Sequence, residues 1–301
     1  MSLKRLLVAG VALSVMAIAL RSFWPSAFHS FDFGAWTISA AGAHDDAVTS
    51  PEAVRRVASF KPAIPGHVLL SDGFENGYFR PLFDYSGDGN TTGASIVASP
   101  VRSGTHAVKI VLDRSMPNKY RTELQPRGSW QAPAFGSTYW YAFSIYLPVN
   151  WVSDPQEEII AQWHGRPDKL LGEGWRNPPL AIYLHGDQYI LYRRWDSKLT
   201  GGKNYDGTDR AVLGTLDGDR GKWTDWVFEI TWSYKAGAGL TRVWKDGVSV
   251  YDVQGPNCFN DRAGGPYFKF GIYKWPWKRS GKFITSRREI YYDDIVVTKA
   301  K

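Results

Sequence analysis

Three short stretches of the chain place long polar side chains on one face of an expected strand. Successive residues of a strand point to opposite faces, so every second residue shares a face. In YRTELQ and IIAQWHG the residues that share a polar face are Arg121, Glu123 and Gln125 in the first, and Gln162 and His164 in the second. A guanidinium group, amides and an imidazole on one surface can hold an anion and move a proton.

A third stretch, YFKFGIY at residues 267–273, has the same two-sided pattern. Its apolar residues form an expected core face, made of Phe268, Phe270 and Ile272. The other face carries Tyr267, Lys269 and Tyr273, and Gly271 lies between the last two. We expect this glycine to let a bulky ligand approach the backbone. An aromatic and basic face of this kind indicates a surface for a charged polymer.

Each of these residues also has a simpler explanation. Arg121 and Glu123 can form an exposed ion pair worth less than about 1 kcal/mol. His164 can be a hydrogen-bonded residue at a strand end, Tyr273 a rim residue, and Lys269 a solvated charge that prevents edge pairing. However, all three stretches carry the same unusual mixture on a non-core face, and this joint occurrence favours a site.

The elements that must position these side chains are short strands. From His67 onward, runs rich in Val, Ile, Tyr, Phe and Trp alternate with clusters of Gly, Asp, Asn and Pro. This pattern predicts at least eight strands, and the tight turns at 185–188 and 245–247 favour antiparallel hairpins. We therefore expect residues 67–301 to form one all-β domain, an antiparallel β-sandwich of the jelly-roll, concanavalin-like kind with a concave groove.

The N-terminus has the pattern of an export signal. Lys4 and Arg5 precede an apolar run at residues 6–20. We expect residues 1–25 to be a signal peptide or an N-terminal anchor and residues 26–66 to be a linker. The protein is then exported, either secreted or periplasmic, and an anchor would be its one link to a membrane.

Charge and composition narrow the classes of function. The 301 residues carry a formal net charge of +7, which predicts attraction to a polyanion without choosing among nucleic acid, anionic lipid and acidic polysaccharide. The single cysteine, Cys258, cannot form an intramolecular disulfide, and a small apolar filler is its commoner role. Neither zinc-ligand spacing nor a phosphate-binding glycine motif occurs in the sequence.

The stretches RTEL, QWH and YFKFGIY resemble, in order and spacing, the three signatures of jelly-roll polysaccharide lyases. The wider context, including YWYAFSIYLPVNW, PPLAIYL and WVFEITWSY, is similar to the heparin-lyase-I-like domain that includes glucuronan lyases. The resemblance spans about residues 70–299. The chain departs from the alginate-lyase signatures at three positions, namely Gln125, Phe270 and Trp275. These changes weigh against alginate more than against lyase chemistry.

The resemblance implies roles for four residues in the β-elimination of a 4-linked uronate. Arg121 and Gln162 would meet the carboxylate, whose negative charge grows as the C5 proton is lost. His164, with an ordinary pKa of about 6.5, is the first choice for the base. Tyr273 would protonate the leaving O4. In some jelly-roll lyases the tyrosine is assigned both steps, so the division of labour stays open.

Further contacts are predicted around these four residues. Expected substrate-binding residues are Lys269, Glu123, Gln125, Arg193, Arg194, Lys274, Trp275 and, as a second stacking candidate, Trp277. The first and last strands carry acids, and the resemblance implies a structural calcium ion there, with Glu75 and Asp294 as candidate ligands. The alternative is that these are ordinary turn and edge acids. No cofactor is expected for the chemistry itself.

Three functions compete at this point. The first is a lyase that cleaves a uronic-acid polysaccharide to 4,5-unsaturated products, with a glucuronan-like polymer favoured over alginate or a glycosaminoglycan. The second is a non-catalytic carbohydrate-binding module of the same fold. A glycoside hydrolase is weakest, because Glu123 is the only acid in the three stretches and hydrolysis needs two carboxyls. The expected partner is an anionic polysaccharide and not nucleic acid, and the protein is expected to be a monomer.

Overall fold

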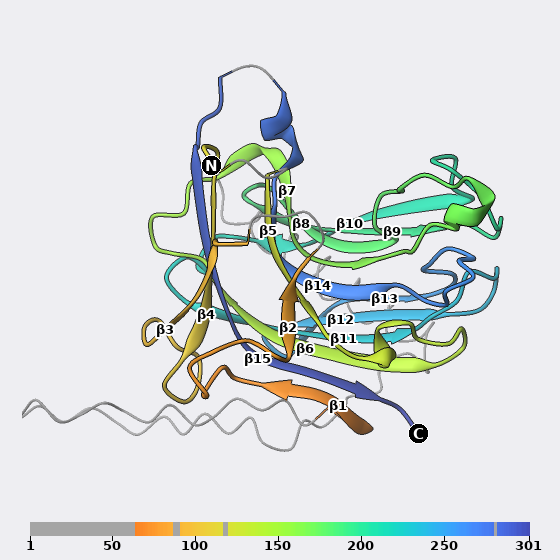
Figure 1. Ribbon diagram of the computed structural model, residues 1–301, viewed down its shortest axis with the longest axis horizontal. Helices are drawn as coiled ribbons and strands as arrows, with labels where there is room; N and C mark the ends of the chain where they lie inside the picture. Colours follow the sequence, from red (N-terminus) through yellow and green to blue (C-terminus); the bar gives the residue numbers. More distant parts are fainter. Residues whose placement is uncertain (1–63, 87–90, 117–119, 280–281) are drawn as a thin grey trace, which may run out of the picture. The chain divides into compact units, whose positions relative to one another are not determined.

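The computed structural model describes residues 64–86, 91–116, 120–279 and 282–301 (Figure 1). The expected signal or anchor at residues 1–25 and most of the expected linker lie outside these residues. Within them, none of the helices is long and apolar enough to cross a membrane.

The described chain folds into two antiparallel β-sheets, so the predicted β-sandwich is confirmed (Figure 1). The first sheet has eight strands, and β1 (His67–Asp72) pairs with β15 (Arg287–Lys299) beside its main path. That path runs in the order β13 (Val248–Gln254), β12 (Leu240–Lys245), β11 (Trp223–Thr231), β6 (Thr138–Tyr146), β15, β4 (Ala107–Asp113) and β3 (Ala94–Val97).

The second sheet has seven strands and carries all three of the signature stretches. Its order is β10 (Gly207–Thr215), β9 (Gln188–Trp195), β8 (Leu180–Gly186), β7 (Asp154–His164), β14 (Tyr267–Tyr273), β5 (Arg121–Pro126) and β2 (Phe83–Tyr85). The short 3₁₀ helix η4 (Trp275–Lys278) follows β14 directly. The central trio β7, β14 and β5 therefore brings together stretches that are far apart in the sequence.

Aromatic side chains fill the space between the two sheets. The predicted core face of β14 is confirmed, since Phe268, Phe270 and Ile272 are fully buried in the main apolar cluster. Trp163 from β7 packs against Phe228 from β11, in the opposite sheet, with ring centroids 4.7 Å apart. Large buried rings contribute much of the hydrophobic stabilisation of a sandwich, and they leave the outer face of the seven-stranded sheet free for polar groups.

Two irregularities interrupt the alternation of faces in these strands. A register shift in β7 between Ile159 and Ala161 places Ile160 in the core and leaves Ile159 on the outer face. Gly271 has a φ of 132°, and a Cβ there would lie 2.3 Å from the carbonyl oxygen of Thr122 in β5. The prediction that Gly271 makes room for a ligand is therefore wrong, because the neighbouring strand occupies that space.

Candidate active site

Strand pairing explains why the signature residues meet. β14 lies between β7 and β5, with Lys269 opposite Gln162 on one side and Tyr273 opposite Arg121 on the other. Directly opposed residues on one face of an antiparallel pair have Cβ atoms about 5 Å apart. The four residues predicted to perform the chemistry thus come from three adjacent strands of one sheet.

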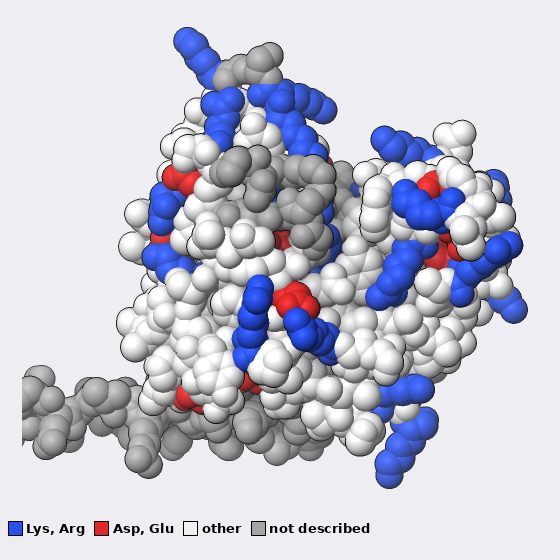
Figure 2. Space-filling view, in the orientation of Figure 1, with Lys and Arg blue, Asp and Glu red and all other residues white. Residues whose placement is uncertain are grey.

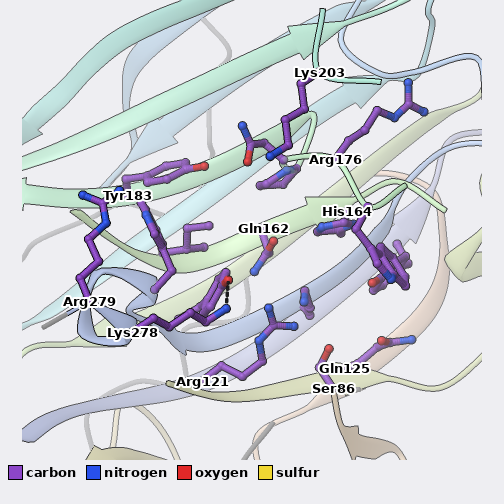
Figure 3. Close-up of a pocket in the computed structure, with 18 residues that line it drawn as sticks. Ser86, Arg121, Gln125, Gln162, His164, Arg176, Tyr183, Lys203, Lys278 and Arg279 are labelled. Atoms are coloured by element: carbon purple, nitrogen blue, oxygen red, sulfur yellow. Dashed lines mark hydrogen bonds between the residues drawn. The ribbon is translucent and has the colours of Figure 1, made fainter. Parts of the chain in front are cut away.

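The outer face of this sheet forms a cavity of about 730 Å³, which is large enough for a sugar segment (Figure 3). All four of the predicted chemical residues line it, together with the predicted contacts Lys269, Gln125 and Trp275. Its other lining residues are Ser86, Ile159, Trp175, Arg176, Asn177, Pro178, Tyr183, Lys203, Tyr267, Lys278 and Arg279.

Glu123 lies beneath this floor and connects three of the groups above it. The Gln162 amide donates a hydrogen bond to one carboxylate oxygen of Glu123. The other oxygen accepts from Lys269 Nζ at 3.1 Å and lies 3.7 Å from Arg121 Nε. Glu123 is only 2% exposed and does not line the cavity, so its predicted role as a substrate contact is wrong. It positions the residues that do line it.

His164 is held as a neutral base. Its Nδ1 lies 2.8 Å from the carbonyl oxygen of Gly165, and because a carbonyl only accepts, Nδ1 carries the proton and Nε2 is the basic nitrogen. Burial and the positive charges of Lys269, Arg121 and Arg176 lower the pKa of His164 to about 3. The imidazole is therefore unprotonated at neutral pH while the cavity holds no anion.

Tyr273 is surrounded by cations. The Arg121 guanidinium lies over its ring, 4.1 Å from the centroid, and Lys278 Nζ donates to its hydroxyl at 3.3 Å. Two other tyrosines line the cavity, and burial raises the pKa of both Tyr183 and Tyr267 to about 12. These two phenols are weaker acids than a free tyrosine, which makes them poorer proton donors.

Positive charge lines the cavity at both of its ends. Figure 3 shows Arg176 and Lys203 at one end, Lys278 and Arg279 at the other, and Arg121 on the floor. Figure 2 shows the surface hollowed in this region, with Lys and Arg side chains on both flanks. Among the residues described as lining the cavity there is no Asp or Glu. The arrangement suits a ligand with several negative charges.

Three of the predicted contacts point elsewhere. Arg193 donates to the Tyr251 hydroxyl of the opposite sheet at 2.8 Å and does not line the cavity. Lys274 is fully buried and pairs with Asp154 at 3.0 Å. Trp277 is a core residue with no exposed surface. The prediction of substrate contact is wrong for these residues, because the strand alternation and the turn into η4 direct them inward.

Arg194 is also buried and does not line the cavity. It lies on the same side of β9 as Tyr192, and its guanidinium is 4.4 Å from the centroid of the Tyr192 ring. Its predicted contact with substrate is therefore wrong, although it donates a long hydrogen bond of 3.5 Å to the cavity tyrosine Tyr183.

Two important lining residues come from a loop that the sequence pattern did not single out. Trp175 is 60% exposed and its ring lies 5.5 Å from that of His164. The adjacent Arg176 is buried and is held by ion pairs to Glu173, at 3.1 Å, and to Asp261. The stretch LGEGWRNPP, rich in Gly and Pro between two strands, was the available signal, since loops carried by a rigid sheet often bear function.

The predicted calcium ligands differ in how well they fit a cation. As predicted, the first and last strands are neighbours. Both oxygens of Glu75 accept hydrogen bonds from the Thr105 backbone, so this carboxylate is already satisfied. Asp294 keeps one buried oxygen without a hydrogen-bond partner, which fits a cation ligand. Within the described residues, no group of three or more His, Cys, Asp or Glu is arranged to hold a metal.

Fold and cavity together define a jelly-roll β-sandwich protein with a cationic groove on one sheet. A family model described as polysaccharide lyase matches residues 74–296, so the chain belongs to the polysaccharide lyase family. A comparison with curated proteins finds no match.

A solved lyase structure shows the same fold. The endo-β-1,4-glucuronan lyase from the fungus Trichoderma reesei is 22% identical with a TM-score of 0.61, covering 77% of this chain and 95% of that one. More distant likenesses include the alginate lyase AlyC3, at 13% identity and a TM-score of 0.43 over 65% and 75% of the two chains. A GH131 β-glucanase catalytic domain from Podospora anserina has 17% identity and a TM-score of 0.44 over 77% and 93%.

Proposed function

We propose that this polysaccharide lyase cleaves a uronic-acid polymer by β-elimination, with a glucuronan-like polymer as the favoured substrate. The observation that carries the proposal is the meeting of Arg121, Gln162, His164 and Tyr273 in one cavity lined by cations. A glucuronan lyase of similar fold supports the choice of polymer. We also propose that the protein is exported, that it is a monomer and that Asp294 binds a structural calcium ion.

The cavity floor is suited to the substrate carboxylate. Loss of the C5 proton builds charge on this group, and fixed donors stabilise that charge better than water does. Arg121 lines the cavity and carries a guanidinium with five N–H donors in a fixed fork geometry. Gln162 donates one amide N–H to Glu123 and has a second N–H that can bind a ligand. The carboxylate in turn offsets the charges of Arg121 and Lys269, which raises the basicity of His164 when substrate binds.

The reaction then needs one base and one acid. His164 Nε2 takes the proton from C5, and the electron pair left at C5 forms the C4–C5 double bond as the C4–O4 bond breaks. Tyr273 gives its hydroxyl proton to O4. No water is consumed, which distinguishes the reaction from hydrolysis.

On a D-glucuronate residue the proposed reaction is a syn elimination. The C5 hydrogen and O4 of this residue lie on the same face of the ring, so base and acid must approach from one side. His164 and Tyr273 both lie on the outer face of the same sheet and line one cavity. A glycoside hydrolase would instead need two carboxyl groups across the groove, and the described lining contains none.

The test is the ultraviolet absorbance of 4,5-unsaturated uronates during incubation with a panel of polyuronates. His164→Ala and Tyr273→Phe should each abolish the absorbance while the protein stays folded. His67→Ala and Tyr78→Phe, which alter exposed residues outside the cavity, are the matched controls. Reducing ends without this absorbance would indicate hydrolysis, and binding without either product would indicate a binding module. Full activity in either cavity variant would refute the assigned roles.

A further inference from the structure

A lysine that the sequence pattern did not single out touches the hydroxyl of Tyr273. Lys278 Nζ donates to this hydroxyl at 3.3 Å, the dashed line in Figure 3, and lies 5.5 Å from the ring centroid. We propose that Lys278 is a proton-relay residue, which stabilises the Tyr273 phenolate formed when O4 is protonated and then returns a proton to it. The inference rests on the proposed function, because it assumes that Tyr273 protonates O4.

The backbone holds Lys278 firmly although its side chain is exposed. It is the last residue of η4, whose Trp277 has no exposed surface. The residue before η4, Lys274, is fully buried and donates to the Gln156 carbonyl oxygen at 3.1 Å in addition to its ion pair with Asp154. A firmly held backbone that carries an exposed ammonium group suits a proton relay, because the ammonium group can exchange protons with solvent.

The surroundings of Tyr273 are positive from more than one element. Arg121 from β5 covers one face of the ring, and Lys278 from η4 reaches the oxygen. The other neighbours are uncharged, namely Trp275 from η4, at 5.6 Å between ring centroids, and Ile159 from β7, which is opposite in the strand register. Among the described residues no carboxylate contacts this phenol, so a phenolate formed during the reaction meets positive charge at both its ring and its oxygen.

The proton balance is complete. Tyr273 loses its hydroxyl proton to O4 and becomes a phenolate. Lys278 transfers one proton from Nζ to the phenolate oxygen and regains one from water, while the protonated His164 releases the C5 proton to water. The two exchanges cancel, so Tyr273, Lys278 and His164 all return to their starting forms.

The experiment compares Lys278→Met, Lys278→Arg and Lys222→Met with wild type on a cleaved polyuronate. Lys222 is an exposed lysine outside the cavity and is the matched control. Loss of a hydrogen bond to a charged group predicts a fall in kcat on the order of tenfold to a hundredfold for Lys278→Met, with a smaller change in KM. The alkaline limb of its pH–rate profile should move to higher pH, because one cation that favours the phenolate is gone.

Lys278→Arg separates charge from proton transfer. Arginine keeps the positive charge but does not release its proton, so it should restore the alkaline limb while kcat stays between those of wild type and Lys278→Met. A wild-type kcat and pH profile in Lys278→Met, or a rise in KM alone, overturns the relay. If wild-type protein forms no unsaturated product from any polyuronate, the proposed function fails and this role fails with it.

Discussion

Glu123→Gln tests whether one buried carboxylate organises the site. In the wild-type protein the side chains of Glu123 and Lys269 are 1% and 2% exposed and form an ion pair at 3.1 Å. The substitution keeps the size of the side chain but leaves the Lys269 ammonium group buried without a counter-charge. Breaking a buried pair from one side typically costs 3–5 kcal/mol, so we expect a loss of about 3 kcal/mol in the free energy of unfolding. For a domain of this size that is roughly 6–12 °C in Tm.

The loss should shrink as the pH rises. Burial lowers the pKa of Lys269, and the negative charge of Glu123 opposes this effect. In Glu123→Gln the folded-state pKa of Lys269 falls further below its unfolded value. The unfolded chain then binds more protons than the folded one, and the stability of the variant rises with pH. Between pH 7 and pH 9 up to about 2.7 kcal/mol of the loss can be recovered, at 1.36 kcal/mol per pH unit.

Urea unfolding monitored by circular dichroism at both pH values is the assay. The double variant with Lys269→Met removes both charges and should recover most of the stability, because no buried charge is left alone. Asp84→Asn is the matched control, since Asp84 and Arg127 form an exposed pair that we expect to be worth less than about 1 kcal/mol. A loss of under about 1 kcal/mol in Glu123→Gln at pH 7 would show that the carboxylate does not hold the floor together.

Two further predictions concern pH and metal. The lowered pKa of His164, about 3 in the free protein, predicts that kcat/KM shows no acid limb near pH 6.5. The acid limb of kcat should lie at higher pH than that of kcat/KM, because the carboxylate of bound substrate offsets the nearby cations. Initial rates from pH 4 to pH 8 test both expectations. An acid limb of kcat/KM at pH 6.5 would contradict the assignment of His164 as the base. If Asp294 holds a structural calcium ion, a chelator should lower Tm and added Ca²⁺ should restore it, whereas an unchanged Tm would remove the ion from the proposal.

Strand periodicity predicted the positions that lie on regular strands. Phe268, Phe270 and Ile272 are core residues, while Lys269 and Tyr273 face the cavity, as their spacing indicated. The periodicity did not predict β10, whose alternating residues are largely exposed, or the three-residue β2. It also failed where a strand is irregular, because a bulge needs the partner strand to reveal it.

The errors at the site have a common physical cause. A sequence shows that a residue is charged but not where its counter-charge lies. Glu123, Lys274 and Arg193 resembled surface contacts, yet each has a buried partner from another strand or loop. Conversely, Trp175 and Lys278 reach the cavity from a loop and a short 3₁₀ helix, where no alternation assigns a face.

The insertion of β14 between β5 and β7 also affects how the protein is made. Lys269 follows its partner Glu123 by 146 residues, so most of the domain must leave the ribosome before the middle of the sheet can close. Until then β5 and β7 each present an unpaired edge, which is a template for aggregation. We therefore expect a chain that ends before residue 267 to lack the groove and to expose the unpaired edges of β5 and β7, which chaperones would have to protect from aggregation.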